Sequence, residues 1–378
     1  MNLLKSDFII REPLLVSILV LITILFSALT HSYSHAYDRR RVTLGVEWFE
    51  RGKQELGNGR PAAAVEDFRT ALLYNPRNWD YSMHLADALS QGHHTEQALN
   101  YYLGLWQSQP NNGPVNLQLA RLSAQKDDVP GAERYFNGAI FGDWAENASA
   151  NRLTASLEMI NFYLERGDSG HAESQLIILS DNLPEDPQLH TRVADLYSRV
   201  GDDQRALKQY RQAAQLDPTY LPAVLGAGEA AFRIGDDPAA QTYLSNSLRL
   251  DESNAAAKNL LAVIQAVSLL NPYQRGISDS EKAKRALRAF AVAGNRLRSC
   301  ATGPGSSAAA SMEPFLERGK QLKAMANARF LIQHPEEIDT LLDFSASAEK
   351  RAQSSCGEPT PDDSALLAIA RRRETEER

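Results

Sequence analysis

An alanine that returns every 34 residues constrains the fold of this chain more than any other feature. The spacing holds for three copies, is broken by one step of 40 residues, and then holds for three more. A bulky residue follows each alanine by four positions, which is the spacing that places two side chains on one face of a helix. A fixed period of this length is typical of an array in which each repeat is one supersecondary unit. The alanines are Ala64, Ala98, Ala132, Ala172, Ala206 and Ala240, and the bulky residues are Phe68, Tyr102, Phe136, Leu176, Tyr210 and Leu244.

A proline stands twelve residues after the alanine in four of the six copies. It cannot donate a backbone hydrogen bond and clashes with the preceding turn, so it predicts the end of a helix. The other two copies have Trp144 and Glu252 in this place. The prolines are Pro76, Pro110, Pro184 and Pro218.

This pattern resembles the tetratricopeptide repeat (TPR). The motif of that family has a small residue at position 8, a glycine near 15, alanine at 20, an aromatic residue at 24 and proline at 32. Position 8 departs from the motif in the fourth copy, where it is Ile160. The other residues at position 8 are Gly52, Ala86, Ala120, Ala194 and Gly228, and the turn glycines are Gly59, Gly167, Gly201 and Gly235.

The resemblance implies an all-α fold, a right-handed α-solenoid of about six helix pairs that covers residues 45–254. Neighbouring units are expected to stack, because one unit cannot bury its own apolar face. The six residues inserted between the third and fourth copies, around 143–152, predict a loop or an extra helical turn. The expected units are 45–78, 79–112, 113–146, 153–186, 187–220 and 221–254.

Residues 255–270 read as a capping helix, because apolar residues recur there at helical spacing. After it, residues 271–378 predict a small α-helical region with a charged tail. Ser278 and Glu281 are spaced as a capping box that opens a helix ending near Leu297. Further helices are expected over about 312–333 and 338–350, with a last short one around Leu366 and Ile369.

Residues 14–29 contain no charged side chain and read LLVSILVLITILFSAL. A helix of this length spans about 24 Å, slightly less than the hydrocarbon core of a bilayer. We therefore interpret residues 1–36 as a cytoplasmic head and a transmembrane signal anchor. The alternative is a signal peptide cleaved after Ala36, since Ser34 and Ala36 are small residues in the places that a signal peptidase needs. In that case the protein would be secreted.

The orientation of the anchor rests on two opposing signals. Lys5 and Arg11 precede the apolar stretch and three arginines, residues 39–41, follow it, which weakly disfavours export of the large domain. A short positive head nevertheless commonly exports the segment that follows it. We expect a single-pass protein with most of the chain exported, in the periplasm or outside the cell.

Cys300 and Cys356 are the two cysteines of the chain. In an exported protein they are expected to form a disulfide, which would close a loop of 56 residues. Two unrelated free thiols are the alternative, and a cytoplasmic location would imply it.

Composition and motifs exclude several kinds of function. Forty basic and 47 acidic residues give a net charge of −7, which argues against a dedicated nucleic-acid-binding protein. Nucleophile-elbow, zinc-protease, phosphate-loop and dinucleotide-binding motifs are absent from the sequence. His93 and His94 are neighbours in a turn and point apart, so they do not predict a metal site. We therefore predict no enzymatic activity, no cofactor and no metal.

In arrays that this chain resembles, the first helix of each unit lines a concave groove that binds a partner. A mixture of apolar and charged side chains there favours a peptide segment over a small metabolite. The pattern that grips chaperone tails in this family is missing. Asp195 is expected to pair with one or both of Arg192 and Arg199. The cluster is either a self-neutralised solvated surface or, joined by Arg233, a positive patch that attracts an acidic partner. The groove residues implied by the resemblance are Met83, His84, Asp87, Leu117, Gln118, Arg121, Asn161, Arg192, Asp195, Arg199 and Arg233.

The sequence thus predicts a non-enzymatic scaffold that is tethered to a membrane and binds another protein. The alternative is a processing or regulatory component whose C-terminal helical region carries an unrecognised activity. The identity of the partner and the oligomeric state are left open.

Overall fold

The computed structural model describes residues 6–302, 306–354 and 356–376, and these residues form eighteen α-helices. The prediction of an all-α chain is confirmed for this part of the protein. The chain divides into two compact units at Phe162 and Tyr163, inside one helix. The helices up to this division are α1 (Ser6–Gly57), α2 (Pro61–Tyr74), α3 (Trp79–Gln91), α4 (Thr95–Ser108), α5 (Gly113–Gln125), α6 (Val129–Phe141) and α7 (Ala148–Glu165).

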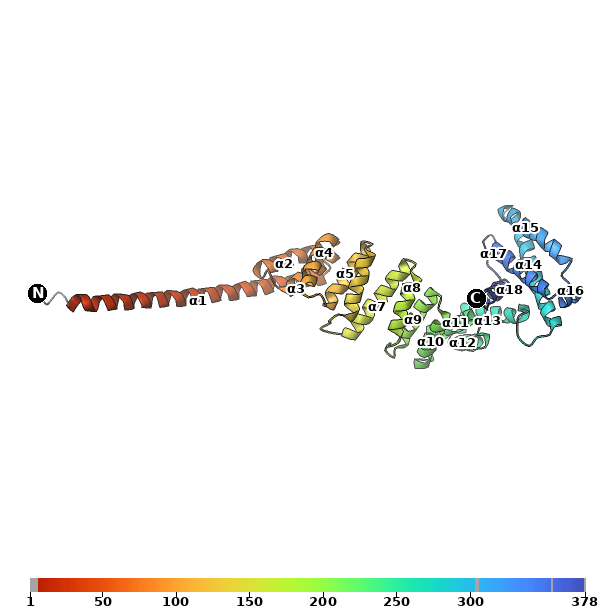
Figure 1. Cartoon of the computed structure of the whole chain (residues 1–378), viewed down its shortest axis with the longest axis horizontal. Helices are drawn as coiled ribbons and strands as arrows, with labels where there is room; N and C mark the ends of the chain where they lie inside the picture. Colours follow the sequence, from red (N-terminus) through yellow and green to blue (C-terminus); the bar gives the residue numbers. More distant parts are fainter. Residues whose placement is uncertain (1–5, 303–305, 355, 377–378) are drawn as a thin grey trace. The chain divides into compact units, whose positions relative to one another are not determined.

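The apolar stretch and the first helix of the first repeat form one continuous helix, α1, of 52 residues (Figure 1). The sequence led us to expect two separate segments, 1–36 and a repeat beginning at 45. They merge because residues 31–44 contain neither glycine nor proline, so nothing ends the helix. The contact with the array begins near Arg41, whose Nε donates a hydrogen bond to the carbonyl of Tyr74 at 2.9 Å.

In the first and sixth units, the glycine at position 8 makes room for the large side chain at position 24 of the same unit. A Cβ atom on Gly52 would lie 2.6 Å from the ring of Phe68, and one on Gly228 would lie 2.7 Å from Leu244. Gly226 is equally close to Tyr210 of the preceding unit, at 2.4 Å. The side chain at position 24 therefore fills the space both inside its own helix pair and toward the next pair.

The turn inside each helix pair contains a residue with positive φ at position 15. Four of these are the expected glycines, with φ between 71° and 87°. In the second and third units the same place is taken by His93 (φ 60°) and Asp127 (φ 62°). These two residues hold a conformation that glycine adopts with less strain, so the turn geometry of the array persists where its sequence signal is lost.

The third junction contains both a loop and an extra helical turn. Residues 142–147 form the loop, and α7 begins at Ala148, earlier than the expected unit boundary. The loop is tied back to the array by Asp143, which exchanges backbone hydrogen bonds with Gly113 and Asn111 at 2.9 and 2.7 Å. Trp144 fills the proline slot and packs on Gly113, while its Nε1 donates to the carbonyl of Ala139 at 2.8 Å.

The second compact unit contains the remaining pairs and the C-terminal region. Its core joins α13 to the C-terminal helices through Val263, Val267, Leu297, Leu341 and Leu366. The expected capping helix is therefore itself covered by the C-terminal region. The helices are α8 (Ser169–Ser180), α9 (Pro187–Val200), α10 (Asp203–Leu216), α11 (Leu221–Arg233), α12 (Asp237–Leu250), α13 (Ala255–Leu270), α14 (Asp279–Thr302), α15 (Ser306–Lys323), α16 (Ala328–Gln333), α17 (Glu336–Gln353) and α18 (Pro361–Glu376).

Two helix boundaries in the C-terminal region differ from expectation. The helix expected over 312–333 is divided into α15 and α16, because Asn327 caps α16 by accepting a hydrogen bond from the amide of Phe330 at 2.8 Å. Helix α14 continues beyond Leu297 to Thr302, so Cys300 lies within the helix and not after its end. At the start of α14, Ser278 caps the amide of Glu281 at 3.3 Å, whereas the Glu281 carboxylate binds Arg285 at 3.1 Å.

Helix α18 closes the C-terminal region against the sixth repeat. Arg372 donates to both carboxylate oxygens of Asp237, at 2.7 and 2.9 Å, and to the carbonyl of Phe232 at 3.1 Å. A bidentate pair of this kind fixes orientation as well as adding free energy. The C-terminal helix is thereby held at the start of α12.

Candidate functional site

The groove residues of the second unit lie beside a cluster of aromatic rings. His84 meets the ring of Phe49 edge-on at 4.8 Å, and Phe49 stacks on Tyr81 at 4.6 Å between ring centroids. Lys53 lies 5.0 Å from the centroid of Phe49. Met83 is half-buried on α3, the helix that carries Tyr81 and His84. This part of the first helices thus offers apolar surface with a cation beside it.

A tyrosine at position 24 binds an aspartate at position 9 in two units. The hydroxyl of Tyr102 donates to Asp87 at 2.5 Å, and that of Tyr210 donates to Asp195. Burial raises the pKa of both tyrosines, and the charge of the aspartate acts in the same direction. Burial also raises the pKa of Asp87, an effect that the hydrogen bond from Tyr102 partly offsets. These aspartates, which the sequence assigns to the groove, therefore bind the second helix of their own pair.

Arg121 belongs to an ion pair with the next unit. It binds Glu158 with two hydrogen bonds, of 2.8 and 2.6 Å, and lies 3.5 Å from the side-chain oxygen of Gln118. Asn161 bonds to the carbonyl of Leu157 at 3.0 Å. Leu117 is 7% exposed, so its side chain belongs to the core and does not line a groove. The expectation that Leu117 lines the groove was wrong, because on α5 this side chain is buried.

The charged residues of the fifth and sixth units are paired differently from the sequence prediction. Arg192, Asp195 and Arg199 are all exposed on α9, but Asp195 accepts its hydrogen bond from Tyr210. Arg233 binds Asp203 at 2.6 Å and Ser198 at 3.0 Å. Its charge is therefore compensated, and it does not add the free positive charge that we expected. Burial raises the pKa of Glu229, which lies near Asp195 and Arg233.

A second cluster of charged residues, which the sequence did not indicate, is buried among α14, α17 and α18. The Nε of Arg296 lies 3.7 Å from the carboxylate of Glu349 and 3.8 Å from that of Asp363. Glu349 is fully buried, and neither of its carboxylate oxygens has a hydrogen-bond partner. Asp363 accepts hydrogen bonds from Thr360, at 2.9 Å from the amide and 2.7 Å from the hydroxyl. Arg296 thus faces two carboxylates, and of these only Asp363 accepts hydrogen bonds from the protein.

The pKa of Glu349 is raised to about 7, first by burial and then by the charge of Asp363, while the charge of Arg296 acts in the opposite direction. Since the pKa in the folded state exceeds its ordinary value of 4.5, protonated Glu349 stabilises the fold. That contribution is complete below pH 4.5 and is lost as the pH rises to about 7. The free energy of unfolding should therefore fall between pH 4.5 and pH 8, and Glu349→Gln should reduce this fall by on the order of 2 kcal/mol. Thermal melts between pH 4.5 and 8 measure it.

The matched control is Glu358→Gln, an exposed residue of the segment between α17 and α18. It should leave the difference in melting temperature between pH 5 and pH 8 unchanged. The same pH profile in Glu349→Gln and the parent would contradict the role given to Glu349.

The two cysteines meet next to this buried cluster. The structure joins Cys300 and Cys356 as a disulfide, with Cα atoms 5.5 Å apart. Gly357, the neighbour of Cys356, accepts a hydrogen bond from Arg296 through its carbonyl oxygen. The covalent link and the charged cluster therefore hold the same segment between α17 and α18.

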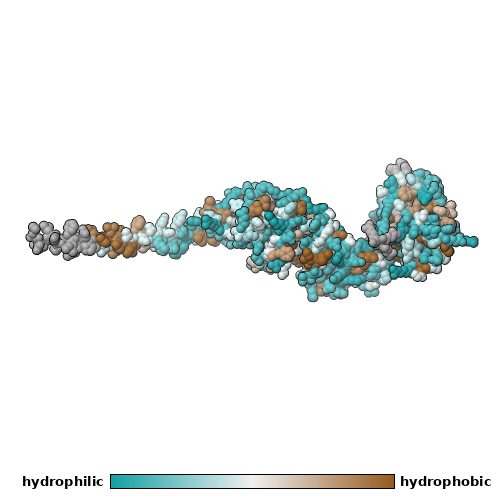
Figure 2. Space-filling model, in the orientation of Figure 1, coloured by the Kyte–Doolittle hydropathy of each residue, from teal (hydrophilic) through white to brown (hydrophobic). Residues whose placement is uncertain are grey.

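Among the described residues, no group of three or more His, Cys, Asp or Glu side chains is arranged to hold a metal ion. One described helix, α1, is long and apolar enough to cross a membrane. None of the residues of its apolar stretch is buried against the rest of the protein (Figure 2). A signal sequence near an N-terminus has the same properties. Both readings of this helix therefore remain in place.

Comparison with known families identifies the repeats. Residues 49–113 and 187–220 each match a model described as tetratricopeptide repeat. These segments are tetratricopeptide repeats. Both matches fall within the part of the chain where the 34-residue spacing was found. The TPR segments include the aromatic cluster around Phe49 and the exposed charges of α9.

Relatives of the TPR segments differ widely from this chain. The general transcriptional corepressor ssn6 of Schizosaccharomyces pombe is 25% identical over 167 residues, which cover 44% of this chain and 14% of that protein. The chain thus aligns with only a small part of that relative. The TPR protein YrrB, described with an unusual peptide-binding site, is 16% identical with a TM-score of 0.39 and covers 52% of this chain and 98% of its own. A TPR protein of Cytophaga hutchinsonii is 12% identical with a TM-score of 0.45, covering 64% and 94%.

Proposed function

We propose that this protein is a scaffold, tethered to a membrane by α1, that binds a segment of another protein along the first helices of its TPR units. TPR repeats generally mediate binding to other proteins, and the two matched segments correspond to the first two units and the fifth unit of the expected array. The observation that carries the proposal is this presence of TPR units on a chain whose α1 holds an exposed apolar stretch. A partner would thus be recruited to a membrane surface.

The first helices suit a peptide segment because they combine apolar and charged surface. Phe49, His84 and Met83 supply the apolar part. Arg192 and Arg199 supply exposed positive charge, seven residues apart on one face of α9. Rings bury much area at small entropic cost, and charges at the rim select among partners.

The partner-binding prediction concerns these two arginines. Changing both Arg192 and Arg199 to glutamate should weaken capture of the partner about three- to tenfold, because the charge of the α9 face is reversed. The melting temperature should remain within a degree or two, since both side chains are exposed. A pull-down from cell extract with the full chain identifies the partner, and titration with that partner gives the affinity.

The control is Lys208→Glu with Arg249→Glu, which makes the same change of charge on exposed residues of the second helices α10 and α12. It should bind like the parent. Equal loss in both double variants would indicate an effect of overall charge and contradict a groove on the first helices. Point variants are preferable to deletion of 271–378, because that deletion would expose the apolar face of α13.

The topology prediction concerns the location of the repeats. Protease added to spheroplasts should degrade the part beyond residue 36 if that part is exported. Protection until the membrane is broken would reverse the orientation. A mature chain that begins at Tyr37, as measured by mass spectrometry, would replace the anchor by a signal peptide.

A further inference from the structure

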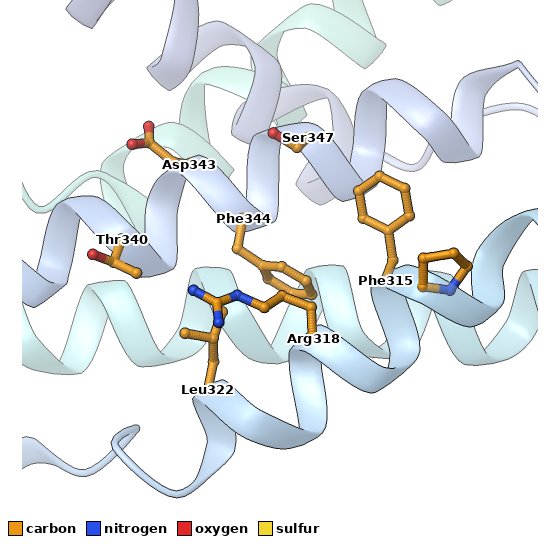
Figure 3. A pocket seen from close by; sticks show the side chains of 8 residues that line it. Phe315, Arg318, Leu322, Thr340, Asp343, Phe344 and Ser347 are labelled. Atoms are coloured by element: carbon orange, nitrogen blue, oxygen red, sulfur yellow. The ribbon is translucent and has the colours of Figure 1, made fainter.

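Two hollows lie on either side of α15 in the C-terminal region. The larger, of about 630 Å³, lies between α14 and α15, and the smaller, of about 420 Å³, lies between α15 and α17. Phe315 and Phe344 line both. In the smaller hollow, Phe344 reaches from α17 toward Arg318 and Leu322 of α15 (Figure 3). Ligand pockets of proteins have volumes of about 300–1,000 Å³, a range that includes both hollows.

The larger hollow is apolar at its base. Leu287, Phe290, Leu316 and Leu297 line it, and Leu297 is only 1% exposed, so the hollow reaches the core of the C-terminal region. It is open because the facing positions carry small residues. Around Gly294, an added Cβ would meet no atom closer than 3.5 Å. The hollow therefore joins exposed side chains at its mouth to buried ones at its base.

Positive charge borders the larger hollow. Its lining includes Arg298, Lys320 and Lys323 but a single carboxylate, that of Glu313. Lys320 is paired with Glu317 at 2.5 Å, and Arg298 donates to the side-chain oxygen of Asn295 at the same distance. The ion pairs found among the described residues include neither Arg298 nor Lys323. The rim therefore has a net positive charge in a chain whose net charge is −7, because Glu317 and Glu313 act on Lys320 while Arg298 and Lys323 have no carboxylate partner among the ion pairs described.

We propose that the larger hollow binds a single-chain anionic amphiphile of the fatty-acid class. The alkyl chain would lie between Phe290 and Leu316, and the carboxylate would lie against Arg298 and Lys323. Burial of the chain supplies the affinity, and the two cations fix its direction. α15 lies between the two hollows, and it packs so closely on Phe344 that a Cβ atom added to Gly319 would lie 3.3 Å from the ring. A partner helix needs one continuous groove, and this division therefore favours a thin alkyl chain.

The test uses the full chain in phosphatidylcholine nanodiscs and a palmitic acid that carries a photoreactive diazirine. After irradiation, mass spectrometry of tryptic peptides locates the adducts. Peptides from α14 and α15 around Phe290 and Leu316 should be labelled. The methyl ester of the probe, which lacks the negative charge, should label them at least about fivefold less. Excess unlabelled palmitate should compete.

Two variants test separately the contacts with the alkyl chain and those with the carboxylate of the probe. Ala291→Trp, at an exposed residue that lines the larger hollow, should fill the hollow and abolish the adducts on α14 and α15. Arg298→Glu with Lys323→Glu should reduce them about fivefold or more. The matched control is Lys284→Glu with Arg351→Glu, on exposed residues of α14 and α17 outside the hollow, and it should label like the parent. Circular-dichroism melts show that each variant is folded.

Several outcomes would overturn the proposal. Labelling confined to residues 15–29 would show only that the probe partitions into the lipid around α1. Equal labelling by the acid and its ester would remove the role of the cations. Stronger labelling by a diazirine phosphatidylcholine in the disc would assign the hollow to a membrane lipid instead. Competition by an apolar peptide helix but not by palmitate would assign it to a protein partner.

Discussion

Phe136→Ala is expected to lower the free energy of unfolding by about 3–5 kcal/mol. Phe136 occupies position 24 of the third unit and is 2% exposed, with its ring centroid 5.9 Å from that of Phe162. Removal of the ring leaves a cavity inside one helix pair and toward the next. Because the repeats contact mainly their neighbours, hydrogen exchange should increase in α5, α6 and the adjacent helices while distant helices stay protected.

Phe141→Ala is the matched control, because Phe141 lies on the same helix but is 74% exposed. It should change the free energy of unfolding by less than about 0.5 kcal/mol. Denaturant titration and hydrogen exchange with mass spectrometry measure both variants. Similar values for the two would show that the repeat register assigned to α6 is wrong.

Loss of the link between Cys300 and Cys356 should cost about 4 kcal/mol, the chain-entropy value for a loop of this length. The effect should be concentrated in the C-terminal region, because the disulfide fixes the segment between α17 and α18 beside Arg296. A Cys300→Ser/Cys356→Ser variant should therefore melt at a lower temperature than the oxidised parent. Dithiothreitol should bring the parent to the same value.

The double variant is its own control for the reductant, since dithiothreitol should leave its melting temperature unchanged. Alkylation of the unreduced parent, followed by mass measurement, should find no free thiol. Two alkylated cysteines would contradict the link and would support the alternative of free thiols in a cytoplasmic protein.

The repeat architecture could be predicted from the sequence because its constraints are local and recur. Gly52 and Gly228 are small because a residue sixteen positions later packs on them, and a small residue has this spacing in every copy except the fourth, which has Ile160. His93 and Asp127 show the limit of the pattern. They take the left-handed conformation of the turn without being glycine, because the flanking helices determine the turn.

The C-terminal helices were harder to predict because apolar periodicity runs across a real boundary. Leu322 and Phe330 keep helical spacing, yet the chain leaves the helix between them. Asn327 was the available signal, since a capping residue inside an apolar pattern marks a new start. The buried Glu349 gave no such signal, because the charges around it, Arg296 and Asp363, lie on two other helices.

The groove residues were predicted from their motif positions, but the hydrogen-bond partners of these residues depend on contacts between helices. Asp195 was assigned to arginines three and four residues away, whereas the structure pairs it with Tyr210, fifteen residues away. Tyr102 and Asp87 repeat that spacing. A search for aspartate and tyrosine at this separation would have found both pairs.

In the membrane-tethered scaffold that we propose, the unbroken course of α1 determines where the repeats can meet a partner. Residues 31–44 span about 21 Å as a helix. A flexible linker of the same fourteen residues would have a root-mean-square reach of about 20 Å, nearly the same, but spread over a broad distribution. The helix keeps the distance between the apolar stretch and the repeats constant, and only the tilt and rotation of the helix remain free. A partner that lies in one narrow layer above the bilayer would meet the repeats often, and one outside that layer would meet them seldom, whatever its affinity.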